Sequence, residues 1–255
     1  SDVLLEKDAL RHTVNVLNHF ENVGGVTGRI KPIFEGEGVA QRSETVYRGF
    51  YHRFMLSESS LHSAFPGNGP LIVYDKSKVP SSIPNDYGST DGNIAINVIR
   101  HGFRFIYIPD AVVFEPSPET LSQHRLQKIR RAKRLLQVFV HNRDIFRDKR
   151  YGNFGLKIFP LKMLTHGLAP ALLFVGLFLL GVDIVLAGNL TLYEITGALL
   201  IAVLSVSVVF KRVGSILSSF LLHEFYLFIG LFSAFGRSIY WNTIERKTNL
   251  ELQAR

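Results

Sequence analysis

The sequence PETLSQHRLQKIRRAKRLLQ, residues 118–137, separates two halves of the chain that differ sharply in composition. Mixed, globular sequence precedes this stretch, and long apolar runs follow it. Its spacing predicts a helix whose apolar face comprises Leu126, Ile129, Ala132, Leu136 and Phe139 or Val140. The remaining surface carries Arg125, Lys128, Arg130, Arg131, Lys133 and Arg134. Such a helix suits a membrane surface, where anionic headgroups attract basic side chains.

Two interpretations of this helix stay open on charge and periodicity. In the first, it is a solvated or lipid-touching basic helix, and Lys128, Lys133 and Arg134 meet the bilayer. In the second, Gln127 and Arg130 face a phosphate, because a guanidinium group offers a planar fork of donors that matches phosphate oxygens. One helix can serve both purposes.

The overall composition narrows the partners of the chain. The 255 residues have a formal net charge of +8, and the positive charges cluster in 125–150, beside the first long apolar run. That position favours lipid headgroups over nucleic acid as the partner. Because the chain contains no cysteine, disulfides and thiolate chemistry are excluded, and any metal needs oxygen or histidine ligands.

Helical and strand patterns alternate over the first 115 residues, which predicts an α/β domain. The first helix, from about Leu4 to Phe20, is expected to bury Leu5, Leu10, Val14, Leu17 and Phe20. The aromatic residues of the second helix, Ser43–Leu61, are expected mainly in the core. The expected strands are Gly24–Ile33, Leu71–Tyr74, Phe103–Ile108 and Ala111–Phe114, the last two separated by Pro109 and Asp110.

Three apolar segments follow the basic stretch. Met163–Val182 and Leu192–Phe210 match the length of a bilayer core and are predicted to span it. The link between them, Asp183–Leu190, contains no Lys or Arg, whereas basic residues flank the pair, so the positive-inside rule places the globular half in the cytoplasm. The third segment, Val213–Phe235, has basic residues near both ends and includes His223 and Glu224. It either spans or is re-entrant or interfacial, and we favour the latter two.

The carboxylate with the most chemical promise is Asp91. Ser89, Thr90 and Asp91 precede a helical pattern that Gly102 ends, so all three are candidates for capping that helix. Asp91 is alternatively a general base that removes a proton from an attacking hydroxyl group. His101, His124, His141 and His166 show no metal-ligand spacing and are expected to be surface or packing residues.

The order of these features resembles the carboxyl-terminal half of a family 2 membrane glycosyltransferase of the GT-A type. In that family a Thr-Glu-Asp motif supplies the catalytic base, and Ser89-Thr90-Asp91 resembles it, with Asp91 as the base and Thr90 in place of the glutamate. Pro118-Glu119-Thr120 and the Gln127 to Arg131 segment correspond to a Pro-Glu-Thr segment and a Gln-x-x-Arg-Trp motif. Residues Gly67, Asn68 and Gly69 resemble a loop near the acceptor.

The resemblance implies a fold, a reaction and a cofactor. The implied fold class is α/β: a partial GT-A (Rossmann-like) domain over 1–117, a basic interface helix and linker over 118–156, membrane helices over 157–236 and a polar tail over 237–255. The implied reaction is inverting transfer of a sugar from a nucleotide-sugar donor to a lipid-linked or glycan acceptor. Asp2 resembles the second aspartate of an Asp-x-Asp motif that holds Mg²⁺ or Mn²⁺ on the donor diphosphate. Gln127 and Arg130 would contact the donor or the acceptor.

Three further expectations complete this interpretation. Arg131 stands where processive members have tryptophan, so its presence favours transfer of one sugar over chain elongation, and a processive polysaccharide synthase is the alternative within the family. The nucleotide-binding half of the family's fold precedes the Asp-x-Asp motif, so we expect a truncated chain that is inactive alone. The rival from another class is a non-catalytic membrane-anchored module that binds anionic lipid or a partner protein.

Overall fold

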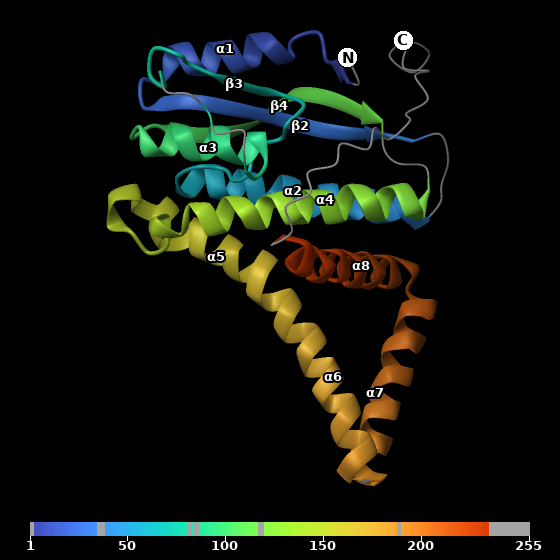
Figure 1. Ribbon diagram of the computed structural model, residues 1–255. Coiled ribbons are helices and arrows are strands. Elements are labelled where there is room, and N and C mark those ends of the chain that lie inside the picture. The colour runs from blue at the N-terminus through green and yellow to red at the C-terminus, as the bar shows by residue number, and fades with distance from the viewer. Residues whose placement is uncertain are drawn as a thin grey trace.

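We describe the protein from a computed structural model that covers residues 3–34, 39–80, 83, 87–116, 120–187 and 190–234 (Figure 1). The elements form successive layers. A mixed sheet has one helix on its upper face and two on its lower face, and further helices lie beneath those two. A pair of helices, α6 (Ala169–Ala187) and α7 (Leu190–Val209), extends away from these layers. The α/β fold class with membrane-compatible helices is thereby confirmed.

The sheet has four strands in the order β1 (Leu4–Leu5), β4 (Arg104–Pro116), β2 (Val23–Ile33) and β3 (Ile72–Tyr74). Strands β2 and β4 are parallel, and the two outer strands are antiparallel to their neighbours. The prediction of two separate strands around Pro109 was wrong, because β4 is continuous. Its pairing passes from Gly28↔Ile108 directly to Arg29↔Val112, so the proline and its neighbours form an irregularity inside one strand.

Helix α1 (Ala9–His19) covers the upper face of the sheet through its small residues. Ala9 and Thr13 are fully buried there, and Val16 and Leu17 pack against the same cluster. The predicted buried set was largely wrong: Leu5, Leu10, Val14 and Phe20 are all exposed. Leu4 and Leu5 form strand β1 and are not part of the helix. The helix buries the face that carries Ala9 and Thr13, which is not the face predicted from its larger apolar residues.

Helices α2 (Val39–Leu61) and α3 (Thr90–Arg100) lie on the lower face of the sheet (Figure 1). Helix α3 is followed, after its cap His101, by Gly102, whose φ of +83° is accessible to glycine without strain, so the helix stops close to the predicted position. Phe105 of β4 and Phe139 of the later basic helix belong, with Phe65, to one buried cluster. The expected aromatic core of α2 is only partly present, because Tyr47 and Tyr51 are half-buried whereas Phe50 and Phe54 are exposed.

Helix α4 (Leu121–His141), which contains the basic stretch, begins at Thr120, whose side chain accepts a hydrogen bond from the Gln123 backbone. Its carboxyl half buries Ala132, Leu136 and Phe139 as predicted, but Leu126 and Val140 are exposed. Its amino half instead buries three polar residues: His124, Gln127 and Lys128. Lys128 therefore does not meet a bilayer, and His124 is a packing residue, which was one of its two expected roles.

Beyond α4, short helical turns connect the globular layers to the extended helices. These are η1 (Arg143–Ile145), η2 (Lys149–Tyr151), η3 (Phe154–Ile158), α5 (Phe159–Met163) and η4 (Leu164–Leu168). Phe154 and Phe159 are fully buried in the cluster around Phe65, with ring centroids 5.8 and 6.0 Å from the Phe65 ring. The start of the long helical stretch is therefore anchored in the domain core.

The remaining helices are strongly apolar. Within the described ranges, two helical stretches are long and apolar enough to cross a membrane, Phe154–Leu186 and Val213–Ser233. The second belongs to α8 (Lys211–Ala234), which packs along α4 and also contacts α2 (Figure 1). A side chain at Gly230 would come within 2.7 Å of Ala132 Cβ, so glycine permits the close approach of α8 to α4. Whether α8 spans a membrane or is re-entrant or interfacial stays a prediction.

Candidate active site

Asp91 lies in the first turn of α3, where the helix meets the loop from β3. The Ser89 hydroxyl caps this helix by accepting a hydrogen bond from the Gly92 backbone N–H at 3.3 Å. The same N–H lies 3.0 Å from Asp91 Oδ1. A Cβ atom built on Gly69 would lie 4.0 Å from Asp91 Oδ2, so the carboxylate faces the predicted acceptor loop. Capping by Ser89 leaves Asp91 available for another role.

The environment of Asp91 makes its carboxyl group a stronger base than an ordinary aspartate. Burial raises the pKa of Asp91 and outweighs the hydrogen bonds from Ser89 and Gly92 and the positive charge of Arg131, which lower it. A raised pKa increases the affinity of the carboxylate for a proton. General bases need this property, provided that the pKa stays below the working pH.

The loop that faces Asp91 is held in a fixed shape. It begins with a cis peptide bond between Phe65 and Pro66, and the Tyr51 hydroxyl donates to the Pro66 carbonyl at 2.8 Å. The buried Asn68 amide group donates to the Gly28 carbonyl at 2.6 Å, and its backbone N–H donates to Thr27 Oγ1 at 2.7 Å. Asn68 therefore attaches the loop to strand β2.

The two glycines of the loop have different surroundings. A side chain at Gly67 would collide with Ile72 and Phe105, each about 3.0 Å from the added Cβ atom, so this position requires glycine for packing. Gly69 has open space except for the Asp91 carboxylate. Of the three predicted loop residues, Gly69 is thus the one that leaves room for a substrate beside Asp91.

A chain of ion pairs connects Arg131 to the interior. Arg131 Nη2 lies 3.1 Å from Glu115 Oε1, and Glu115 Oε2 lies 3.3 Å from Arg48 Nη2. Arg48 in turn lies 2.8 Å from Glu44, one turn earlier on α2. The Glu115 and Arg48 side chains are only 7% and 10% exposed, whereas the Arg131 side chain is 38% exposed. The buried Glu115 therefore holds the partly exposed guanidinium group of Arg131 in place. The positive charge of Arg131 lowers the pKa of Asp91.

Two tyrosines complete the surroundings of Asp91, and the sequence did not identify them as site residues. The negative charge of Asp91 acts on both Tyr47 and Tyr51, and burial, as the larger cause, raises the pKa of each hydroxyl group. Both therefore remain neutral donors at physiological pH. The signal available in the sequence was the i, i+4 spacing of Tyr47 with Tyr51 and of Glu44 with Arg48, which places each pair along one helix face.

The other predicted site residues are less closely associated with Asp91. Thr90, its neighbour on α3, is exposed. Gln127 is buried on the inner face of α4, and Arg130 is partly buried. The structure thus places Arg131 and Gly69 near Asp91, and it places Asn68 and Gly67 in the supporting loop.

The predicted metal ligand, Asp2, lies outside the described residues. The described chain begins at Val3, and the next residues, Leu4 and Leu5, pair with Phe114 and Val113, directly before Glu115. The carboxylates described in this region do not form a metal-ligand set by themselves, because Glu115 is paired with two arginines and Asp91 lies beside Arg131. The Mg²⁺ or Mn²⁺ site thus stays a prediction that depends on Asp2.

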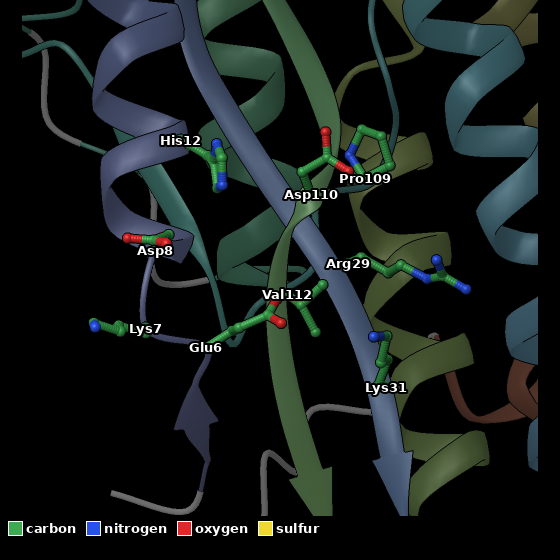
Figure 2. Close-up of a pocket in the computed structure, with 9 residues that line it drawn as sticks. All are labelled: Glu6, Lys7, Asp8, His12, Arg29, Lys31, Pro109, Asp110 and Val112. Atoms are coloured by element: carbon green, nitrogen blue, oxygen red, sulfur yellow. The ribbon is translucent and has the colours of Figure 1, made fainter. Parts of the chain in front are cut away.

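A separate surface pocket is lined by residues of β2, β4 and the start of α1 (Figure 2). Its lining combines three acidic and three basic side chains: Glu6, Asp8, Asp110, Lys7, Arg29 and Lys31. This balance of charge gives no general attraction for a diphosphate. The pocket includes none of the predicted site residues, so it is not part of the candidate active site.

The mixed sheet with helices on both faces is the α/β arrangement that the resemblance implies, and Asp91, the loop at Gly69 and Arg131 lie near one another in it. The family model described as glycosyl transferase family group 2 matches residues 1–236. The chain belongs to this family.

The structural comparison agrees with this assignment of fold. The chain is similar to the mannosyltransferase PcManGT from Pyrobaculum calidifontis, solved in complex with GDP-Man and Mn²⁺. The TM-score is 0.68 at 20% sequence identity, and the match covers 91% of this chain. It covers 62% of the other chain, so this sequence spans less than two thirds of that protein's length. A search of the curated proteins gave no match.

Proposed function

We propose that this protein is a membrane-bound inverting glycosyltransferase that moves a sugar from a nucleotide-sugar donor to a lipid-linked or glycan acceptor. The observation that carries the proposal is the position of Asp91, a carboxylate of raised pKa between the rigid loop at Gly69 and the guanidinium of Arg131. Family membership and the likeness to a GDP-mannose-bound mannosyltransferase support nucleotide-sugar transfer.

In the proposed reaction, Asp91 removes the proton of the acceptor hydroxyl group. The resulting oxygen nucleophile attacks the anomeric carbon, a new glycosidic bond forms, and the bond between that carbon and the diphosphate breaks with inversion. Arg131 is placed to stabilise the negative charge that develops on phosphate, because it presents a fixed fork of donors at the edge of the site. Gln127 and Arg130 are proposed to contact the donor or the acceptor.

The proposed metal would be Mg²⁺ or Mn²⁺, and Asp2 would help to hold it. When bound, such an ion supplies positive charge that stabilises a leaving diphosphate. The carboxylate of Asp2 offers the oxygen ligand that both ions prefer.

A membrane location is supported by the surface of the α6–α7 pair. Large apolar side chains remain exposed along it, including Phe178 at 69%, Leu186 at 80% and Val209 at 71% exposure. Water would disfavour so much exposed apolar surface, whereas a bilayer would cover it. The basic residues near the domain ends of the pair support the proposal that the catalytic part is cytoplasmic, because the positive-inside rule favours basic residues on that side.

The test uses the intact protein in detergent or lipid vesicles. We expect it to bind a nucleoside diphosphate sugar in the presence of Mn²⁺, measured by calorimetry over a panel of donors, and to release the nucleoside diphosphate when an acceptor is supplied. Chelation of the metal should weaken donor binding. Failure to bind any donor of the panel would contradict the proposal and favour the non-catalytic, lipid-binding module.

A further inference from the structure

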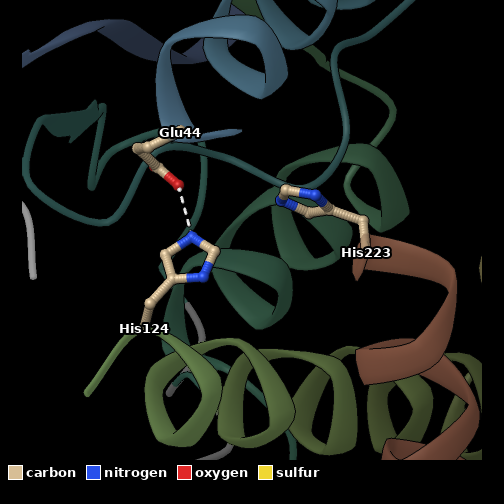
Figure 3. Close-up of side chains that lie close together, drawn as sticks. All are labelled: Glu44, His124 and His223. Carbon is tan, nitrogen blue, oxygen red and sulfur yellow. Dashed lines mark hydrogen bonds and ion pairs between the residues drawn. The ribbon is translucent and has the colours of Figure 1, made fainter. Parts of the chain in front are cut away.

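Three side chains with metal-ligating atoms converge at a point where three helices meet (Figure 3). Glu44 comes from α2, His124 from α4 and His223 from α8, so residues far apart in sequence lie together. One ligand atom from each residue lies within 4.8 Å of the other two. Glu44 and His124 are almost completely buried, and His223 is partly buried. A cluster of this composition was not visible in the spacing of the histidines along the chain.

The hydrogen bonds of His223 leave a lone pair directed into the protein. Its Nδ1 lies 2.7 Å from the Ser219 carbonyl oxygen, which can only accept, so Nδ1 carries the proton and Nε2 presents a lone pair. The Tyr47 ring, stacked on the imidazole at 4.5 Å, fixes the ring plane. Nε2 is buried and has no hydrogen-bond partner in the described part of the chain. A histidine that donates one ring N–H to a backbone carbonyl and leaves the other nitrogen free has the usual arrangement of a metal ligand.

His124 and Glu44 have a separation that fits a shared ion better than a hydrogen bond. His124 Nε2 lies 3.4 Å from Glu44 Oε2, which is long for a charge-assisted hydrogen bond. Two ligands of one tetrahedral zinc ion, each about 2.1 Å from it, lie roughly 3.4 Å apart. His124 Nδ1 is buried without a hydrogen-bond partner among the residues described. It is therefore an unsatisfied donor in one neutral tautomer of the imidazole and an unsatisfied acceptor in the other.

A cation already occupies the space beside Glu44. Lys128 Nζ lies 2.6 Å from Glu44 Oε2 and 3.7 Å from the centroid of the Tyr47 ring. The carboxylate and the aromatic face both attract positive charge, so the cluster is built for a cation. Because a divalent ion and an ammonium group would repel each other at this distance, an ion can enter only when the Lys128 side chain withdraws.

We propose that Glu44, His124 and His223 form a second divalent-cation site, which takes a zinc-class ion in exchange for the Lys128 ammonium group. Two imidazole nitrogens and one carboxylate oxygen select Zn²⁺ or a similar transition metal over Mg²⁺, which prefers oxygen ligands. The site shares no ligand with the proposed donor metal, for which Asp2 is the proposed ligand. A bound ion would join α8 to α2 and α4, the helices that carry Tyr47 and Arg131 to Asp91.

The test measures zinc binding by the intact protein without nucleotide, after chelator treatment and dialysis, by calorimetry and elemental analysis. We expect one zinc ion per chain in the wild type. His124→Ala and His223→Ala should each lose it, whereas the exposed-histidine control His101→Ala and the donor-site variant Asp2→Asn should retain it. Lys128→Gln should lower the zinc Kd by about tenfold or more, because it removes the competing charge.

The tighter zinc binding expected for Lys128→Gln cannot be explained by misfolding, since a misfolded protein would not bind zinc more tightly than the wild type. Absence of zinc from both the wild type and Lys128→Gln would overturn the proposal. So would equal zinc binding in the wild type and both histidine variants. Sugar transfer is not part of the measurement, so the outcome is independent of the proposed activity.

Discussion

Replacing Asp91 with asparagine is the most direct test of the proposed base. The asparagine side chain has nearly the same size, and its amide oxygen can still accept the 3.0 Å hydrogen bond from the Gly92 backbone. Ser89 remains in place as the cap of α3, and asparagine is as favourable as aspartate near a helix start. The substitution therefore removes the negative charge and the proton affinity but leaves the helix intact.

The expected magnitude follows from the role of the carboxylate. Proton transfer to a positioned side chain contributes about 10²- to 10⁴-fold to a rate. At about 1.4 kcal/mol per factor of ten, Asp91→Asn should raise the barrier by about 3 to 5.5 kcal/mol. Donor affinity should stay close to that of the wild type, because the proposed proton comes from the acceptor and not from the donor.

The assay is release of nucleoside diphosphate at saturating donor and acceptor, with donor binding measured separately by calorimetry. Asp75→Asn is the matched control, because Asp75 also accepts a backbone N–H, from Ser77 at 2.8 Å, but belongs to an exposed turn after β3. We expect the control to keep its turnover. Undiminished turnover in Asp91→Asn would refute the base assignment and leave Asp91 as a residue of the helix start.

Three further outcomes are expected around this carboxylate. Since burial raises the pKa of Asp91, the proton acceptor is lost as the pH falls, and kcat/KM should decline on the acid side at a pH above the ordinary range of aspartate. Arg131→Gln should move that acid limb to still higher pH, because the positive charge of Arg131 lowers the pKa of Asp91; an unmoved limb would show that the two groups are not coupled. Glu115→Gln should reduce the unfolding free energy by about 3 kcal/mol, because it leaves the buried Arg48 with one carboxylate partner instead of two, whereas the exposed Glu21→Gln should change it little, both measured by thermal unfolding.

The sequence predicted the elements that local rules determine. Ser89 and Gly102 mark the two ends of α3 by their capping preferences, and these ends were found where expected. The apolar length of Met163–Val182 likewise identified a helical stretch that is long enough to cross a membrane, and Leu192–Phe210 was correctly predicted to be helical. Each of these features depends on residues within a few positions of one another, which is why one sequence was sufficient.

The sequence failed where packing decides which residues are buried. Leu126 and Lys128 lie on α4 with exposures opposite to those expected from their polarity. The reason lies in the partners: Glu44, from a helix some eighty positions earlier, provides a buried charge for Lys128, whereas nothing in the described part of the chain covers Leu126. Periodicity cannot reveal a partner of this kind, because a charged residue is expected to be exposed to solvent unless an opposite charge is known to lie beside it in the fold.

Helix α4 carries two groups of polar residues that meet buried charges of the domain. Arg131 pairs with Glu115, whereas His124 and Lys128, earlier on the same helix, meet Glu44 on the side where α8 packs. Glu44 and Arg48 are one turn apart, so the two groups of charges share the same stretch of α2. A shift of α8 against α4 would therefore disturb the charges that fix Arg131.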